Sequence, residues 1–464
     1  MATQNNDFLF REPSTKSREL VRRDQKVLSP SYTRSYGFVM GHGQGAEVWD
    51  ADGNQYVDFA AGIAVLSTGH RHPKIIQAIR EQTERYVHIG ATDFFCPEQV
   101  KLAEKLQQII PIDKASPEDV MVYFGNSGTE AVEAALKLAR YQSGARRHII
   151  SFYGGFHGRT MGALSVTASK AIQRADYPFI PGGVEHVPYP AKNACADCCG
   201  EGSCSTCWCD SVKFIEEFII KRKVPGNEIA AIIVEPIQGE GGYVLPRDDF
   251  FPRLREMCDR YGILLISDEI QAGMGRTGKW TAMEHWGVKP DITCLAKGLG
   301  SGFPIGAIVT RSDVMKEWVP GAHASTFGGN PLACAVASAT IDVIEGEGLL
   351  EHVHRLGEYT LERLNAFKAN HPSIRRVEGK GLMIGVEFGD AEGNLLPEFR
   401  NQVEHRCFLD GLLNLACGTS ALRIAPPLVI TEEQLRQGLD IMENAIAQLE
   451  ESIWEDLSSA QVAH

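Results

Sequence analysis

Two stretches decide the fold class of this chain: Gly262-Ile-Leu-Leu-Ile-Ser-Asp-Glu-Ile-Gln-Ala-Gly-Met-Gly-Arg-Thr-Gly278 and Asp291-Ile-Thr-Cys-Leu-Ala-Lys-Gly-Leu-Gly300. Each contains a short apolar run, which leads to Asp268 in the first stretch and to Lys297 in the second. Such runs between helical patterns are typical of buried parallel strands. Ligands of open α/β sheets bind just beyond the carboxyl ends of the strands. The sequence therefore predicts that a carboxylate and an amine face one crevice, where glycines leave room for a flat ligand.

A lysine and an aspartate at such an edge are the groups that pyridoxal phosphate (PLP) requires. We expect Lys297 to form the Schiff base, and Asp268 to face the pyridine nitrogen and keep it protonated. Ile270 would then pack on one face of the ring, and Gln271 would reach the ring hydroxyl. The competing interpretations are a solvated surface lysine and an aspartate that only caps a helix or a turn.

Composition limits the class of protein. The chain has 464 residues and a net charge of −13, with 44% hydrophobic and 23% charged residues and no run of basic residues. This balance argues against nucleic acid and anionic membranes as partners. A chain of this length is expected to fold as two or three domains. Neither a membrane-spanning apolar stretch nor a signal peptide is recognisable, so we expect a cytoplasmic protein.

The order of patterns along the chain predicts an α/β fold. Residues 1 to about 30 are expected to form an extended or partly ordered arm, and two alternating runs around an Asp-Gly turn in Glu47–Phe59 predict a β-hairpin. Helical patterns then alternate with buried strands, which implies right-handed crossovers and a mainly parallel sheet. The strands expected there, besides those already quoted, are Val120–Phe124, His148–Phe152, Ile229–Val234 and Ile305–Thr310. From about Leu332, long helical patterns around Gly381–Phe388 predict a smaller α/β domain.

A phosphate-binding turn is predicted at Gly125-Asn-Ser-Gly-Thr-Glu130, which follows a strand and opens a helix. Its glycines let backbone N–H groups point at an anion, and the helix dipole adds to the attraction. Ser127 and Thr129 can add hydroxyl donors. An ordinary N-cap by serine or threonine is the alternative interpretation.

Another strand end, Phe152-Tyr-Gly-Gly-Phe-His-Gly-Arg-Thr160, offers groups for the ring and for the substrate. Phe156 can stack on the second face of the ring, and Arg159 can bind a substrate carboxylate through two hydrogen bonds. Plain core packing is the alternative for Phe156. We expect His157 to be structural or to stack, because Lys297 already supplies a base.

Glu235 and Arg423 form a predicted switch for substrate carboxylates. Glu235 stands at a strand end in Glu235-Pro-Ile-Gln-Gly-Glu-Gly-Gly242, and Arg423 opens Arg423-Ile-Ala-Pro-Pro427. Glu235 would neutralise Arg423 while an amine without an α-carboxylate is bound, and would release it when an α-carboxylate arrives. Two unrelated surface charges are the alternative.

With these motifs the chain resembles the class III (ω-amino acid) aminotransferases, which are PLP-dependent enzymes of fold type I. The likeness is greatest to the 4-aminobutyrate, ornithine and acetylornithine aminotransferases and covers residues 33 to about 450. The motifs that carry it, in family order, are Ala61-Gly-Ile-Ala-Val-Leu-Ser-Thr-Gly-His70, Gly125–Glu130, Phe156–Thr160, Glu235–Gly242, Asp268–Gly278, Lys297, Ser325-Thr-Phe-Gly-Gly-Asn-Pro331 and Arg423–Pro427.

The resemblance implies an architecture of two domains. A large PLP-binding domain over residues 69–335 would hold a mainly parallel sheet sandwiched by helices, with a cysteine-rich insertion at 190–211. A smaller α/β domain would be built from both termini: residues 336–464, and the arm and β-hairpin of residues 1–68. The resemblance further implies a homodimer or a higher homo-oligomer with shared active sites.

The resemblance also assigns roles to residues. Lys297, Asp268 and Glu235 would be catalytic, and Lys297 would move the proton. Arg159 and Arg423 would hold the carboxylates of donor and acceptor, with Glu235 as the gate between them. The implied cofactor-binding residues are Ser127, Gly128, Thr129, Phe156, His157, Asp268, Ile270, Gln271 and Lys297, joined by Thr326 of the partner subunit.

Ile63 bears on the identity of the donor. Its position resembles one held by an aromatic residue in ornithine aminotransferases and by isoleucine in 4-aminobutyrate enzymes, and acetylornithine enzymes can also carry isoleucine there. We therefore predict that the amino group of 4-aminobutyrate passes to 2-oxoglutarate, giving succinate semialdehyde and glutamate. The alternatives are ornithine or N-acetylornithine as donor, and a PLP-dependent amino-acid racemase or epimerase of the same fold. A non-catalytic PLP-fold protein is a further alternative, against which the intact Lys297 counts.

A cysteine-rich segment departs from the better-known members of this family. Six of the 12 cysteines lie in Cys195-Ala-Asp-Cys-Cys-Gly-Glu-Gly-Ser-Cys-Ser-Thr-Cys-Trp-Cys209. Two Cys-x-x-Cys pairs, Cys195 with Cys198 and Cys204 with Cys207, have the local spacing of zinc ligands. A structural Zn²⁺ on these four thiolates is one hypothesis, and reduced or disulfide-paired surface thiols are the other.

Overall fold

A computed structural model describes residues 9–11, 14–144, 146–177, 180–192 and 210–462 of the chain. The four predicted zinc ligands, Cys195, Cys198, Cys204 and Cys207, lie outside these residues, so the zinc hypothesis stays a prediction. Within the described ranges, no group of three or more histidine, cysteine or acidic side chains could hold a metal ion. None of the described helices is both long enough and apolar enough to cross a membrane.

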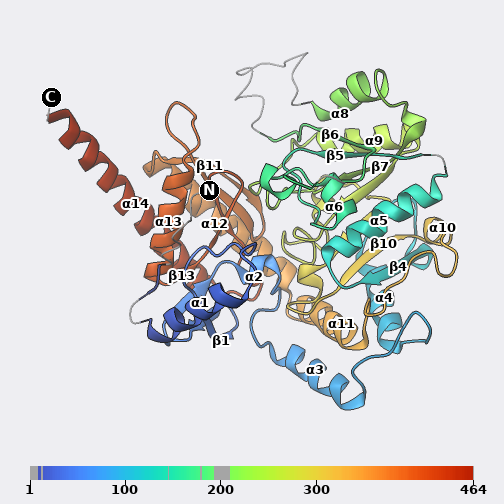
Figure 1. Ribbon diagram of the computed structural model, residues 1–464, viewed down its shortest axis with the longest axis horizontal. Coiled ribbons are helices and arrows are strands. Elements are labelled where there is room, and N and C mark those ends of the chain that lie inside the picture. Colours follow the sequence, from blue (N-terminus) through green and yellow to red (C-terminus); the bar gives the residue numbers. More distant parts are fainter. Residues whose placement is uncertain (1–8, 12–13, 145, 178–179, 193–209, 463–464) are drawn as a thin grey trace.

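A mainly parallel sheet of seven strands forms the core of the larger part of the molecule (Figure 1). Its strands, in spatial order, are β4 (Val120–Gly125), β10 (Gly306–Arg311), β9 (Ile292–Leu295), β8 (Leu264–Asp268), β7 (Ile229–Val234), β5 (His148–Phe152) and β6 (Val184–Val187). β10 runs antiparallel to β4 and β9, and the other neighbouring pairs are parallel. The predicted α/β class with a mainly parallel sheet is thus confirmed.

Helices cover both faces of this sheet because its central strands bury side chains on both sides. In β7, Ala231 and Ile233 belong to an apolar cluster with α5 (Gly128–Gln142) and α6 (Met161–Val166). The alternate residues Ile232 and Val234 belong to a second cluster with α8 (Ser211–Phe214) and α9 (Phe250–Tyr261). This double burial explains why the strand reads as a continuous apolar run rather than as an alternating one.

Two smaller sheets lie on the other side of the molecule (Figure 1). The first contains β1 (Met40–Gln44), β2 (Glu47–Asp50), β3 (Gln55–Asp58) and β13 (Leu412–Leu413); the second contains β11 (Ile374–Lys380), β12 (Met383–Phe388), β15 (Ala421–Ile424) and β14 (Leu415–Cys417). The antiparallel pair β2–β3 confirms the predicted hairpin. Because β13 pairs with β3, segments from near both ends of the chain share one sheet. The boundaries of the two domains stay a prediction.

Further helices complete the fold. They are α1 (Thr15–Val27), α2 (Ala61–Ala64), α3 (Pro73–Arg85), α4 (Pro97–Ile109), α10 (Ser312–Met315), α11 (Pro331–Gly346), α12 (Leu349–Asn370), α13 (Pro397–Asp410) and α14 (Glu432–Val462). α4 and α11 share an apolar cluster with β4, β9 and β10. α12, α13 and α14 pack against the small sheets.

Within the segment expected to be an extended or partly ordered arm, residues 1 to about 30, Thr15–Val27 forms the helix α1, which the sequence did not predict. The start of this helix is held by a residue of the hairpin turn. Asp52 accepts hydrogen bonds from the N–H groups of Lys16 and Ser17, at 2.9 and 3.0 Å, and from the Ser17 hydroxyl at 2.5 Å. A cap supplied by a residue so distant in the sequence leaves no local pattern.

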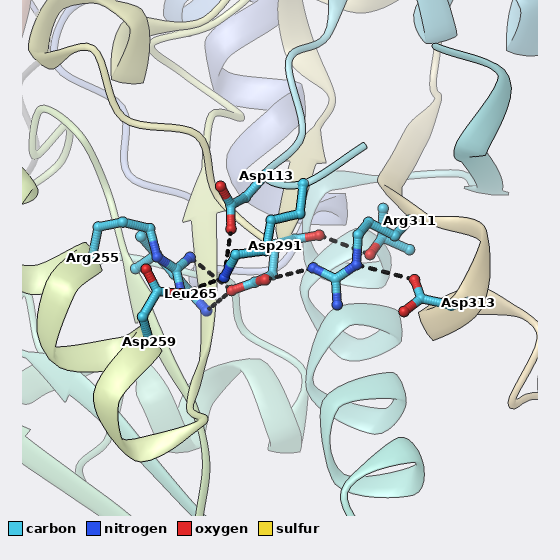
Figure 2. Close-up of polar contacts among 9 residues, drawn as sticks. Asp113, Arg255, Asp259, Leu265, Asp291, Arg311 and Asp313 are labelled. Atoms are coloured by element: carbon cyan, nitrogen blue, oxygen red, sulfur yellow. Dashed lines mark hydrogen bonds and ion pairs between the residues drawn. The ribbon is translucent and has the colours of Figure 1, made fainter. Parts of the chain in front are cut away.

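A buried charge network fixes β9 at the end opposite to Lys297. Figure 2 shows Asp291 between Arg255 of α9 and Arg311 of β10. Its carboxylate accepts hydrogen bonds from both guanidinium groups and from the N–H of Leu265, each at 2.8 Å. The network therefore joins α9, β8, β9 and β10 around one carboxylate, whose side chain is only 6% exposed.

We predict that Asp291→Asn lowers the midpoint of urea denaturation, by an amount equal to about 3 kcal/mol of unfolding free energy. The amide removes the buried counter-ion that Arg255 and Arg311 share and leaves them only their more exposed partners, Asp259 and Asp313, which accounts for the cost. Asp313→Asn is the matched control, because Asp313 also pairs with Arg311 but is 73% exposed. A similar loss in both variants would contradict the importance of the buried network.

Candidate active site

Asp268 and Lys297 converge because β8 and β9 are neighbouring parallel strands. Asp268 ends β8 and stands opposite Cys294 of β9. Lys297 opens the 3-10 turn Lys297–Leu299 that follows β9. Its backbone has a φ of 39°, in a region that costs a non-glycine residue roughly 1 kcal/mol or more. The turn therefore fixes the backbone of the lysine beside the carboxylate.

Asp268 is buried and held by two donors. Its Oδ2 pairs with Nδ1 of His157 at 2.7 Å, and its Oδ1 accepts from the N–H of Ile270 at 3.1 Å. Burial alone would lower the pKa of His157, but the hydrogen bond and the charge of Asp268 outweigh it and raise that pKa. His157, expected to be structural or to stack, thus acts on the site by orienting Asp268.

The predicted phosphate-binding turn follows β4. Ser127 is the N-cap of α5, and its Oγ accepts from the N–H of Glu130 at 3.3 Å. A Cβ at Gly306 of β10 would lie 2.1 Å from the carbonyl oxygen of Ser127, so this glycine lets the turn lie against the sheet. Thr129 Oγ1 lies 2.9 Å from Thr160 Oγ1. Hydroxyl groups and the helix N-terminus together make a suitable environment for a phosphate.

One cavity of about 540 Å³ joins these groups. It brings together these sequence-predicted residues: Ser127, Gly128, Thr129, Phe156, His157, Arg159, Glu235, Asp268, Ile270, Gln271 and Lys297. Its size lies in the usual range of ligand pockets. The lining residues that sequence reasoning missed are Val65, Asn126, Gly158, Ala296, Gly302, Phe303, Pro304 and Ile305. Of these, Val65, Asn126, Gly158 and Ala296 stand inside stretches quoted above, so the sequence could have indicated them by their position there.

The donor set of the cavity fits PLP. Ser127 and Thr129 can hold the phosphate, Asp268 the ring nitrogen, and Lys297 the aldehyde carbon. Gln271 independently indicates that a ligand with a hydrogen-bond donor binds here, because its Oε1 is buried and has no hydrogen-bond partner within the described part of the chain. The ring hydroxyl would supply the donor that this oxygen lacks.

The environment of Lys297 favours the neutral, nucleophilic amine. Burial is the largest cause and lowers the pKa of Lys297 to about 8, and the positive charge of Arg423 acts in the same direction. Asp268, Glu235 and Glu240 oppose the shift without cancelling it. An amine with this pKa is available for covalent chemistry near neutral pH.

Arg423 is paired with Glu240, and the predicted pairing with Glu235 is wrong. Nη2 of Arg423 donates to Glu240 Oε2 at 2.9 Å and to the carbonyl oxygen of Ala416 at 2.7 Å. Glu235 instead accepts from the N–H groups of Phe156 and Gly239, at 3.0 and 3.1 Å. Both glutamates belong to the same glycine-rich loop, and the tertiary position of β15 decides which of them meets the arginine.

Glu235 therefore does not have the environment expected of a group that covers and releases Arg423. It is only 7% exposed. Burial raises the pKa of Glu235 to about 7, against the opposing charge of His157. Its two backbone donors tie the Phe156 turn to the loop that follows β7, so the residue supports the wall of the cavity.

Three predicted residues lie outside the cavity wall of the described chain: Ile63, Thr326 and Arg423. Ile63 is 49% exposed and has a φ of 69° within α2. Thr326 is exposed. Arg423 is buried but lies near enough to Lys297 to lower its pKa. Arg159, which does line the cavity, is exposed, with its guanidinium carbon 5.9 Å from the centre of the Phe156 ring.

Comparison with known proteins agrees with this geometry. The family model described as aminotransferase class-III matches residues 28–446. An acetylornithine aminotransferase of Methanopyrus kandleri is 41% identical, over 93% of this chain and 98% of its own length. An alanine/serine racemase of Pyrococcus horikoshii is 37% identical, over 95% and 92%. Among solved structures, the ornithine aminotransferase of Toxoplasma gondii superposes with a TM-score of 0.81 at 31% identity, over 94% and 96%.

We predict that Lys297 in the cofactor-free protein reacts with an aldehyde reagent with a midpoint near pH 8. Reaction needs the deprotonated amine, so labelling should rise as the pH increases through the lowered pKa of Lys297. Ordinary surface lysines should show a midpoint near pH 10.4. Borohydride trapping followed by peptide mass spectrometry measures each lysine separately. A midpoint for Lys297 equal to that of the surface lysines would contradict the assignment.

Proposed function

This chain belongs to the class-III aminotransferase family and is a PLP-dependent aminotransferase, and on that premise we propose that it transfers the terminal amino group of an ω-amino acid to 2-oxoglutarate. The single observation that carries the proposal is the convergence of Lys297, Asp268 and the Ser127–Thr129 turn on one cavity. N-acetylornithine is the first donor to test, because the relative from Methanopyrus kandleri is an acetylornithine aminotransferase. The comparison favours this alternative over the predicted donor, 4-aminobutyrate.

Each cofactor-facing residue has a distinct task in the proposed reaction. Bound PLP would act as an electron sink that makes a proton next to the transferred nitrogen removable. Lys297 would take up this proton and return it at the neighbouring carbon, because its lowered pKa leaves much of the amine neutral near pH 8. Asp268, oriented by His157, would hold the protonated ring nitrogen. Ser127 and Thr129 would bind the phosphate.

Two arginines would bind the substrate carboxylates. Arg159 at the cavity wall would hold the carboxylate far from the reacting amine of the donor. Arg423 would hold the α-carboxylate of 2-oxoglutarate or glutamate, and Glu240 would cover Arg423 while the donor is bound. Ile63 would contribute an apolar contact to the donor. This arrangement lets one cavity accept two kinds of substrate in turn.

We propose a homodimer in which Thr326 of the partner subunit completes the phosphate site. Thr326 lies outside the cavity wall of its own chain, in the same loop as Phe327, which is 62% exposed. Phe94 and Phe95 are also exposed, at 63% and 101%. Exposed aromatic side chains of this kind are typical of surfaces that bury themselves in an interface.

A racemase is the second candidate, and the likeness to the alanine/serine racemase of Pyrococcus horikoshii supports it. The same cofactor-binding residues would serve both reactions. A racemase returns the proton to the opposite face of the α-carbon and needs no oxo acid. The two functions therefore differ in whether an oxo acid is required, which can be measured.

The test is to incubate PLP-loaded protein with 2-oxoglutarate and each of four donors: N-acetylornithine, 4-aminobutyrate, ornithine and 5-aminovalerate. We predict that glutamate accumulates and that kcat/KM is highest for N-acetylornithine, roughly tenfold or more above ornithine, because the apolar Ile63 would offer no hydrogen bond to the free α-ammonium group of ornithine. Lys297→Ala should lower kcat by roughly a thousandfold or more.

Two results would contradict the proposed function. One is the absence of glutamate with all four donors, together with racemisation of an L-amino acid in the absence of any oxo acid. The other is unchanged turnover in Lys297→Ala. A higher kcat/KM for 4-aminobutyrate than for N-acetylornithine would keep the transaminase and overturn the choice of donor.

A further inference from the structure

Glu240 lies between two cations rather than beside one. Its Oε2 accepts from Arg423 at 2.9 Å, and its Oε1 accepts from Lys170 Nζ at 2.6 Å. Arg423 is buried, with 4% of its side chain exposed, whereas Lys170 is 40% exposed and Glu240 is 24% exposed. Burial would raise the pKa of Glu240, but Arg423 and Lys170 hold it below its usual range. The glutamate is therefore an anion held between a buried arginine and a surface lysine.

A carboxylate can bind Arg423 through two hydrogen bonds only after a rearrangement. The two bidentate edges of a guanidinium group are Nη1 with Nη2 and Nε with Nη2. The two protons of Nη2 are occupied by Glu240 and by the carbonyl oxygen of Ala416. Nε and Nη1 are buried and have no hydrogen-bond partner in the described part of the chain. The arginine thus offers free donors, and Glu240 is the movable group that blocks a bidentate contact.

The cluster of Glu240, Arg423 and Lys170 has an excess of positive charge, which favours the binding of one additional anion. Arg423 and Lys170 carry two positive charges against the single negative charge of Glu240. When a substrate carboxylate binds Arg423, the cluster holds two cations and two anions. Without Lys170, the same event would leave Glu240 and the substrate carboxylate to share one arginine, and their mutual repulsion would oppose binding.

Lys170 is placed to follow Glu240 as it moves. It precedes the short turn Ala171–Gln173 and follows a segment held against the Phe156 loop, where Gly154 N–H donates to Ala168 at 3.0 Å and Ala168 N–H to Gly155 at 2.8 Å. The backbone before Lys170 is therefore anchored, whereas its long, partly exposed side chain is free to adjust. Lys170 does not line the cavity, so it can act on a substrate only through Glu240 or through its charge.

We infer that Lys170 is a positioning residue for the carboxylate site at Arg423: it retains Glu240 when Glu240 leaves Arg423, and so admits the α-carboxylate of 2-oxoglutarate. The inference rests on the proposed function for the identity of that substrate. It adds a residue outside the recognised motifs to the machinery that lets one cavity alternate between donor and acceptor. An amino donor that presents no α-carboxylate to Arg423 would not require Glu240 to be displaced.

The experiment compares the PLP-loaded wild type with Lys170→Met and Lys170→Arg. In Lys170→Met, the KM for 2-oxoglutarate should rise roughly tenfold. The KM for the amino donor and the kcat should stay within twofold, because Arg423 stays covered in that half-reaction. Lys170→Arg, which keeps the charge, should restore the KM for 2-oxoglutarate. The difference between wild type and Lys170→Met should shrink as salt is raised from 0.05 to about 0.5 M.

Lys221→Met is the matched control, because Lys221 also pairs with a glutamate, Glu217, at 2.6 Å on an exposed surface. This control should leave both KM values unchanged. Equal changes in the donor and acceptor KM of Lys170→Met, or no change in either, would overturn the inference. So would an equal effect of Lys221→Met.

Calorimetric titration of 2-oxoglutarate into the same proteins separates this inference from the proposed function. A dissociation constant for 2-oxoglutarate that is roughly tenfold higher in Lys170→Met than in the wild type supports the inference. This holds even if the wild type forms no glutamate, in which case only the proposed function fails. Equal dissociation constants in wild type and Lys170→Met overturn the inference even where transamination is observed. Failure of the wild type to bind 2-oxoglutarate overturns it as well.

Discussion

The parallel pairing of β8 with β9 is the constraint on which the rest of the site depends. It sets Asp268 opposite Cys294 and so delivers Lys297, which opens the turn after β9, to the same edge of the sheet. The strands that carry these residues are apolar on both faces, and helices on both sides keep them in place. At their opposite ends, Asp291 joins β8, β9 and β10 through hydrogen bonds to Leu265 and Arg311. A slip of one residue in this pair would separate the carboxylate from the amine.

Around this pair, the buried side chains of Asp268, Glu235 and Arg423 each have a polar partner. His157 orients Asp268, and two backbone N–H groups hold Glu235. Arg423 is covered by Glu240, and its Nε and Nη1 have no hydrogen-bond partner among the residues that the structure describes. The first two arrangements are fixed by the fold and, in the proposed function, would support the bound cofactor. In the proposed function the third would be the movable one, because a reaction with two different substrates would require Glu240 to leave Arg423.

The sequence predicted most of the fold and the cofactor end of the site, because strand ends and glycine-rich turns leave local patterns. The Asp268 and Lys297 strands and the turn at Ser127 are examples. The helix Thr15–Val27 was missed because its cap, Asp52, comes from the hairpin turn. The choice of Glu235 over Glu240 failed for a related reason. Both glutamates stand in one loop, and the sequence does not show which of them β15 brings against Arg423. Lys170 left no signal at all, since a single lysine before a short turn is normally a solvated residue.

The central claim is that Lys297 is the residue to which PLP becomes attached, and borohydride reduction of the PLP-loaded protein tests it most directly. After digestion, mass spectrometry locates the added mass of the reduced cofactor. The structure predicts that this mass is found on the peptide that contains Lys297, in an amount close to one per chain, and that it is absent after Lys297→Ala. Recovery of the cofactor on another lysine, or its retention in Lys297→Ala, would contradict the account.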